Sequence, residues 1–308
     1  MKYSVIILLN EGLDDFEQYL DSIQQALSDR GTDYEIVIMA NGVDGFLRRS
    51  QQSICSVDKR VRCFSFNRRT TEAVCLKAGL KESMGEVILV CGSYQQISHE
   101  SIGKLLDGID GEADVVLPWR RQRVDPRFNQ LQSKLFNAVV RRITNSNLHD
   151  LSCTFRVFRR QVLEECEFYG NMYRFLPIMA ARKGFRIKEV ECEHVHERGK
   201  TGFYSLSEYL LRIVDVLTLY FNDRFNKQPL RFFSSLGFTF LAIGILVFVY
   251  VFFQKFLFGV PIGGRAVLLV GTLLMVIGTQ IVGIGLLGEI IVFTYGRYKK
   301  EYRISKTI

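Results

Sequence analysis

Two stretches near the end of the chain contain no charged residue: Phe232–Phe253 and Ala266–Gly288. An apolar helix needs roughly 20 residues to cross the hydrocarbon core of a bilayer, and each stretch is long enough. Uncharged runs of this length are hard to reconcile with a buried helix of a soluble domain. The sequence therefore predicts two membrane-spanning helices, which form a transmembrane hairpin.

The chain also lacks the cysteine spacings that mark zinc sites and redox motifs. None of its seven cysteines forms a C-x-x-C pair. We therefore expect reduced thiols in a reducing compartment, and no zinc site. No signal peptide is expected either, because the apolar run Ser4–Leu9 is short and Asn10 and Glu11 follow it at once.

The charge balance is basic, with a formal net charge of +8. A basic protein attracts anionic lipid and phosphorylated ligands, and basic flanks of membrane helices prefer the cytoplasmic side. We therefore expect a multi-pass protein of the inner (cytoplasmic) membrane, with its head domain and C-terminus in the cytosol. The basic flanks are Arg224, Lys227 and Arg231 before the hairpin, and Arg297, Lys299, Lys300, Arg303 and Lys306 after it.

The first part of the chain alternates between strand and helix patterns. Apolar residues at helical spacing mark Asp14–Ser28 and Glu72–Ser83. Alternating strands and helices predict an α/β fold with a parallel sheet, whose ligands bind beyond the carboxyl ends of the strands. The predicted strands are Ser4–Leu9, Tyr34–Ala40, Val61–Phe66, Glu86–Gly92, Asp114–Trp119 and Phe185–Cys192.

A further helix is predicted between this head and the hairpin. Ser205–Phe221 carries leucines and aromatics on one side. It is either a packed helix or an amphipathic helix in the membrane interface, and its place before the first apolar run favours the interface. The predicted domains are a head at 1–204, a juxtamembrane helix at 205–228, the hairpin at 229–296 and a basic cytosolic tail at 297–308.

Several short motifs occur in a characteristic order. The first strand ends in Asn10–Glu11, and Ala78–Leu80 precedes the fourth strand. The sequence DLSCTFRVFRR begins at Asp150, and HERGKTG contains Arg198 and Lys200. These motifs, with the tail GIGLLGEIIVFTYGRYKKEYRI, resemble family 2 glycosyltransferases of the polyprenyl-phosphate type, which include the dolichyl-phosphate mannosyltransferases and undecaprenyl-phosphate glycosyltransferases.

The resemblance covers nearly the whole chain and implies a fold and an activity. The fold is GT-A-like, which is related to the Rossmann fold. The activity is inverting transfer of a sugar from a nucleotide sugar to polyprenyl phosphate at the cytosolic membrane face, as part of cell-envelope polysaccharide synthesis. The expected partners are the nucleotide sugar, polyprenyl phosphate and the bilayer, with no nucleic acid.

The chain departs from the family pattern where the donor is expected. The fourth strand of the family ends in Asp-x-Asp-x-Gln, but here Cys91 and Ser93 replace the acidic pair and only Gln95 is kept. Asn41 likewise stands where an aspartate helps to hold the base. Thiol and hydroxyl groups are poor ligands for hard divalent cations. No cofactor is therefore predicted, and Mg²⁺ or Mn²⁺ stays an open alternative.

Candidate site residues follow from the resemblance and from the expected strand ends. Asp150 and Arg156 are the predicted catalytic residues, with a helix cap and a structural ion pair as their respective alternatives. Arg198 and Lys200 are predicted to contact the acceptor lipid phosphate. The predicted donor and phosphate contacts are Asn10, Glu11, Asn41, Arg68, Arg69, Cys91, Ser93, Gln95, Arg120 and Arg121.

Two interpretations remain open at this point. Arginines at the strand ends, including Arg123, replace the metal, and the protein is an active transferase. Alternatively the protein is a degenerate paralogue that binds lipid phosphate or a partner transferase without chemistry. A homo-oligomer is also open, because Gly271, Gly278, Gly283 and Gly285 allow close helix packing.

Overall fold

The computed structural model describes residues 2–10, 16–42, 58–121, 127–144, 146, 148–195, 214–215, 218, 229–259 and 266–296. Tertiary contacts divide the chain into two compact units. One is Met1–Val216 with Tyr302–Ile308, and the other is Leu217–Glu301. The predicted helix at 205–221 lies almost wholly outside the described residues.

The first unit is built on a sheet of seven strands in the order β3-β2-β1-β4-β6-β5-β7. All neighbouring pairs are parallel except those made by β6, which runs antiparallel to both β4 and β5. The predicted parallel sheet is confirmed, and β6 is an addition to it. The strands are β1 (Tyr3–Leu9), β2 (Tyr34–Asn41), β3 (Val61–Phe66), β4 (Val87–Cys91), β5 (Val115–Trp119), β6 (Arg156–Arg159) and β7 (Ile187–Glu191).

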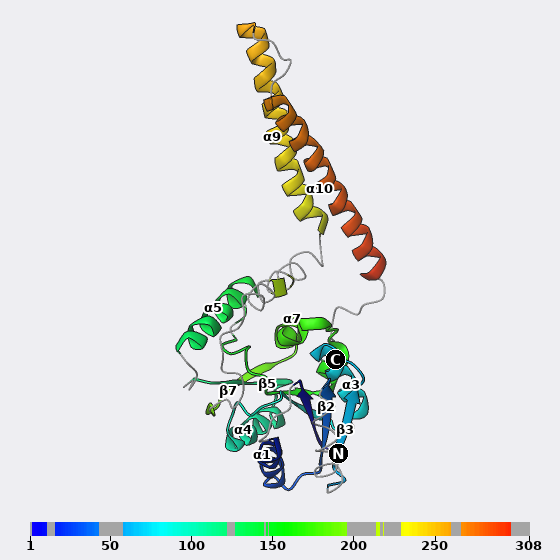
Figure 1. Ribbon diagram of the computed structural model, residues 1–308, viewed down its shortest axis with the longest axis vertical. Helices are drawn as coiled ribbons and strands as arrows, with labels where there is room; N and C mark the ends of the chain where they lie inside the picture. The colour runs from blue at the N-terminus through cyan, green and yellow to red at the C-terminus, as the bar shows by residue number, and fades with distance from the viewer. Residues whose placement is uncertain are drawn as a thin grey trace, which may run out of the picture. The chain divides into compact units, whose positions relative to one another are not determined.

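Helices cover both faces of this sheet (Figure 1). Alternate residues of β1 point to opposite sides, so Val5 and Ile7 pack with α1 and α4, while Ile6 and Leu8 pack with α3, α6 and α7. The helices are α1 (Phe16–Ser28), α3 (Glu72–Glu82), α4 (His99–Asp110), α5 (Arg127–Thr144), α6 (Arg160–Glu165), the 3-10 helix η2 (Gly170–Phe175) and α7 (Leu176–Arg182).

Gly79 explains why the Ala78–Leu80 motif carries a glycine. A Cβ built at this position lies 2.7 Å from Cγ2 of Ile6 on β1, which is closer than real contacts allow. Glycine therefore lets α3 approach the sheet closely, and this places the beginning of α3 beside the carboxyl ends of β1 and β2.

A buried carboxylate ties strands together at the opposite end of the sheet. Glu35 on β2 is 3 % exposed. It accepts hydrogen bonds from Ser4 Oγ at 2.7 Å, from the Met84 amide at 2.5 Å and from Arg62 Nη2 at 2.6 Å. Burial alone would raise the pKa of Glu35, but these three donors hold it below its ordinary value.

One expectation about the cysteines is wrong. Cys63 is disulfide-bonded, so it is not the reduced thiol that its spacing suggested. The cysteines at 75, 91, 153, 166 and 192 are free and buried. Isolated spacings do not reveal a cystine, because a disulfide depends on proximity in the fold and not along the chain.

The second unit contains two long apolar helices, α9 (Pro229–Phe258) and α10 (Ala266–Gly296). Both are long and apolar enough to cross a membrane, with mean hydropathies of 2.6 and 2.3. They pack through glycines: a Cβ at Gly237 would lie 2.7 Å from the carbonyl oxygen of Gly278. At one end Glu289 Oε2 of α10 accepts the Leu230 amide of α9 at 3.2 Å, which caps the beginning of α9.

Candidate functional site

Two asparagines meet at the carboxyl ends of β1 and β2. Asn41 is 2 % exposed, and its Nδ2 donates to Asn10 Oδ1 at 2.7 Å and to the Thr70 carbonyl at 2.9 Å. Its Oδ1 accepts the Thr70 amide at 2.7 Å. Asn10 Nδ2 in turn donates to Glu72 Oε1 at 3.0 Å. The structure thus brings the predicted Asn10 and Asn41 together, and it adds Thr70 and Glu72.

Sequence reasoning missed Thr70 and Glu72, although a signal was present. Thr71 is the N-cap of α3 and has an extended backbone, so Glu72 stands in the first turn of the helix. A carboxylate at that position is favoured by the helix dipole. It lies close to Asn10 because α3 follows directly after the end of β3.

Cys91 lies in the core and not at the open edge of the sheet. It is the last residue of β4 and is fully buried among residues that include Tyr19 of α1 and Cys153. Burial raises the pKa of the Cys91 thiol far above its usual value. The thiol is therefore uncharged at neutral pH. A neutral, enclosed thiol is unsuited to a hard divalent cation.

Ser93 uses its hydroxyl to join two strand ends. Its Oγ accepts the Asn10 amide at 2.9 Å and donates to the Leu8 carbonyl at 3.2 Å. Nearby, Gln95 Nε2 donates to the Ile97 carbonyl at 3.1 Å. Positions 91 and 93 therefore offer a buried thiol and an engaged hydroxyl, and these residues do not fit Mg²⁺ or Mn²⁺.

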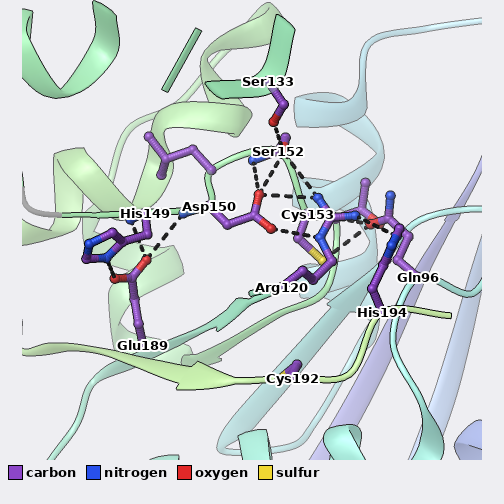
Figure 2. A network of polar contacts seen from close by, with 12 residues as sticks. Gln96, Arg120, Ser133, His149, Asp150, Ser152, Cys153, Glu189, Cys192 and His194 are labelled. Carbon is purple, nitrogen blue, oxygen red and sulfur yellow. Dashed lines mark hydrogen bonds and ion pairs between the residues drawn. The ribbon is translucent and has the colours of Figure 1, made fainter. Parts of the chain in front are cut away.

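A buried ion pair joins the end of β5 to the loop before β6 (Figure 2). Arg120 Nε donates to Asp150 Oδ2 at 2.7 Å, and its Nη2 donates to Oδ1 at 3.2 Å. The side chains are only 1 % and 5 % exposed. Ser152 adds two donors to Oδ1, its amide at 3.1 Å and its hydroxyl at 2.6 Å. These four hydrogen bonds hold Asp150, and Arg120 supplies an opposite charge to it.

The same guanidinium reaches two further elements. Arg120 Nη1 lies 3.3 Å from His194 Nε2, and because a guanidinium only donates, the imidazole nitrogen accepts. Arg120 Nη2 also donates to Ser152 Oγ at 3.1 Å, and that hydroxyl is 3.0 Å from Ser133 Oγ of α5. Figure 2 shows these side chains converging from β5, α5 and the segment after β7. His194 and Ser133 were not among the predicted site residues.

A more exposed cluster flanks this ion pair. The rings of Trp119 and His149 stack with centroids 4.5 Å apart, and His149 Nδ1 lies 2.8 Å from Glu189 Oε2 on β7. Arg121 lies over Trp119 at 5.8 Å and pairs with Glu191 at 3.1 Å. The predicted donor contact Arg121 is thus exposed and lies over the half-buried Trp119, beside the buried Arg120.

The guanidinium of Arg156 donates hydrogen bonds to backbone carbonyls. Arg156 is 2 % exposed, and its guanidinium donates to the carbonyls of Cys153, Leu151 and Tyr173 at 3.2, 2.8 and 3.2 Å. These bonds fix the loop that carries Asp150 against η2. A catalytic role for Arg156 stays a prediction, and the bonds in the structure are those of a residue that positions this loop.

Arg68 and Arg69 are exposed at the same sheet edge as Asn41. A Cβ built at Gly42 lies 3.2 Å from Cβ of Arg69, so the chain after β2 passes close to this arginine. Neither guanidinium has an ion pair within the described ranges. The predicted residues Glu11, Arg123, Arg198 and Lys200 lie outside the described residues.

The fold and the motifs are those of a known enzyme class. The glycosyl transferase family 2 matches residues 4–167, which is more than half of the chain. The chain belongs to this family of glycosyltransferases, and the predicted family is confirmed.

The similar curated proteins have names that include a polyprenyl phosphate. The dodecaprenyl-phosphate galacturonate synthase of Rhizobium johnstonii is 28 % identical over 86 % of this chain and 80 % of its own length. The undecaprenyl-phosphate 4-deoxy-4-formamido-L-arabinose transferase of Proteus mirabilis is 26 % identical over 100 % of this chain and 94 % of its own length.

Solved structures support the fold. Glucosyl-3-phosphoglycerate synthase from Mycobacterium tuberculosis, in complex with Mn²⁺, UDP and phosphoglyceric acid, aligns with a TM-score of 0.53 at 16 % identity. The alignment covers 72 % of this chain and 78 % of that chain. The predicted GT-A-like fold is therefore confirmed, followed by two apolar helices.

Proposed function

We propose that this protein moves a sugar from a nucleotide sugar to polyprenyl phosphate at a membrane surface. The observation that carries this proposal is the extent of the similarity. The relative from Proteus mirabilis matches the chain from end to end, so the likeness includes the two apolar helices as well as the head. In this proposal the hairpin anchors the head at the membrane surface, where the phosphate group of the lipid is exposed.

The reaction makes different demands on the acceptor and on the leaving group. A phosphate oxygen of the acceptor attacks the anomeric carbon, and the bond from that carbon to the nucleoside diphosphate breaks. A phosphate monoester with a second pKa of about 6 is mostly dianionic at neutral pH, so it needs no strong base. Charge that develops on the diphosphate does need stabilisation.

Arg68 and Arg69 are the best placed cations for that task among the described residues. They are exposed beside the Asn10–Asn41 pair, where ligands of such sheets bind. Arg120 is less suited, because its charge is enclosed and matched by Asp150. A guanidinium binds phosphate oxygens with two parallel hydrogen bonds, which suits a diphosphate.

Asp150 and Arg156 have positioning roles in this proposal. Asp150 orients Arg120 and the loop before β6, since its oxygens accept four hydrogen bonds. Arg156 fixes the same loop through backbone carbonyls. Together they hold the surface on which donor and acceptor meet, while Arg198 and Lys200 are proposed to contact the lipid phosphate.

A membrane topology belongs to the same proposal. The head and the basic tail lie in the cytosol, α9 and α10 both cross the inner membrane, and the segment 205–228 lies in the interface. Reporter fusions at residue 262 and at the C-terminus test this directly. A periplasmic signal from the first and a cytosolic signal from the second are expected, and the reverse result contradicts the topology.

Arginine variants test the catalytic part of the proposal. Arg68→Met and Arg69→Met are incubated with polyprenyl phosphate and a panel of UDP- and GDP-sugars, and the glycolipid is measured. Arg60→Met is the matched control, because Arg60 is an exposed arginine at the other end of β3. Loss of rate in the first two and not in the control is expected. Full activity in both contradicts the arginine assignment.

A further inference from the structure

One face of α10 carries a second heptad pattern that α9 does not cover. The glycines that contact α9 are spaced by seven residues, as at Gly271, Gly278 and Gly285. A separate set of residues, spaced alternately by four and by three, is exposed along the same helix. We name this set the outer seam. It consists of Leu269, Leu273, Val276, Gln280, Gly283, Leu287 and Ile290.

The outer seam has the spacing of a coiled-coil interface. Alternating steps of four and three keep one stripe of a helix facing a partner helix in a left-handed pair. Its members are exposed although they are mostly large and apolar, with Leu269 at 73 % and Leu287 at 62 %. Lipid tails can cover such apolar side chains, so the spacing alone does not show that a partner helix binds here.

Gln280 makes the difference, because it places an amide at the centre of the seam. It lies at the midpoint of the apolar span Ala266–Thr294. Thr272 and Thr279 satisfy their hydroxyls within the helix, by donating to the carbonyls of Leu268 and Met275 at 2.9 Å. Within the described residues, the Gln280 amide has no hydrogen-bond partner. In hydrocarbon an unsatisfied amide is costly.

The surface beside Gln280 is hollowed. A hollow of about 270 Å³ is lined by Met275, Val276, Thr279 and Gln280. One turn further along, a Cβ built at Gly283 meets nothing within 4 Å. Small residues at such a position let two backbones approach closely, which brings interhelical hydrogen bonds within reach.

We propose that the outer seam pairs with the outer seam of a second copy of this chain. An amide both donates and accepts, so Gln280 is complementary to itself across a two-fold axis along the membrane normal. Copies inserted with the same topology present the seam in parallel, and each residue then faces its own counterpart. A single polar residue in an apolar seam also fixes the register of the pair.

The pairing rests on the proposed hairpin crossing a membrane. A lipid tail is the simplest other occupant, but it offers no donor or acceptor to Gln280. A different membrane protein is another occupant, and it predicts that the purified chain is monomeric in liposomes. Both are outcomes of the experiment below.

Cysteine cross-linking in native membranes tests the geometry. Val276→Cys and Leu287→Cys lie on the seam, whereas Val270→Cys and Leu286→Cys are exposed at 51 % and 53 % but lie off it. In a parallel pair, the same seam position of the two copies comes close enough for a disulfide. Oxidation is expected to give covalent dimers at 276 and 287 only. Equal cross-linking at the off-seam positions, or none at the seam, overturns the proposal. The parent chain controls for its own cysteines.

The fraction of dimer in liposomes tests whether the Gln280 amide contributes to association. Gln280→Leu is expected to weaken association roughly tenfold, as for the loss of interhelical hydrogen bonds, whereas Gln280→Asn keeps most of it. An unchanged dimer fraction in Gln280→Leu overturns the proposal. Sugar transfer and carbonate extraction are measured on the same preparations. Monomers that stay in the membrane and transfer sugar refute the pairing alone, while release by carbonate refutes the proposed anchor.

Discussion

Replacing Asp150 by asparagine tests whether the buried Arg120–Asp150 pair contributes more to stability than an exposed ion pair does. The substitution keeps the shape of the side chain and removes its charge. It leaves the guanidinium of Arg120 buried, with a side chain that is 1 % exposed, and removes the carboxylate charge of Asp150 that faces it. Breaking a buried pair in this way costs about 3–5 kcal/mol. For a domain of this size the melting temperature should fall by about 10 °C.

The single tryptophan of the chain supplies the assay. Trp119 precedes Arg120 and stacks on His149, so its fluorescence reports unfolding at this place. Arg121→Met is the control, because the exposed Arg121–Glu191 pair is worth only about 0–1 kcal/mol. The double variant Arg120→Met/Asp150→Leu should recover most of the lost stability, since it removes both charges of the pair.

A catalytic readout completes this prediction. If Asp150 positions Arg120 and its loop, then Asp150→Asn lowers kcat without adding a new step to the pH profile. Loss of a limb of that profile would instead mark Asp150 as a proton acceptor. A shift in melting temperature no larger than that of Arg121→Met refutes the reasoning from burial.

Three further predictions concern other parts of the molecule. Because the pKa of Glu35 lies below its ordinary value, its contribution to stability is present above about pH 4.3 and is lost as the pH falls through the folded pKa. Chemical unfolding from pH 3 to 7 should therefore show a shallower acid limb for Glu35→Gln than for the parent. Gly237→Ala should destabilise the helix pair by about 1–3 kcal/mol, because the added Cβ meets the Gly278 carbonyl at 2.7 Å; unfolding in detergent checks this. Glu289→Ala removes the cap of α9 and should cost about 1 kcal/mol in the same assay, whereas Glu289→Gln should cost less.

Much of the fold follows from local apolar patterns. The runs at Ser4–Leu9 and Tyr34–Ala40 are continuous because both faces of β1 and β2 are buried, and they were predicted correctly. Strand β6 was missed. Its residues, Arg156–Arg159, span only four positions and place the two apolar side chains, Val157 and Phe158, between two arginines, and they were interpreted as part of a family motif.

The candidate site was harder to predict, because its contacts join distant parts of the chain. Arg120 and Asp150 were both selected, yet nothing in the sequence indicates that they form a buried pair 30 residues apart. His194 was not selected as a site residue, because no motif in the sequence includes it. The environment of Cys91 depends on Tyr19 of α1, and strand position alone does not reveal on which side of the sheet a side chain lies.

The central claim is that this chain transfers sugar although positions 91 and 93 do not fit a divalent cation. The most direct measurement is glycolipid formation by the purified full chain from polyprenyl phosphate and each of a panel of nucleotide sugars, with Mn²⁺ and with EDTA. Product from at least one donor, at a rate that EDTA leaves unchanged, is the predicted result. Product that requires Mn²⁺, or no product from any donor, contradicts the account.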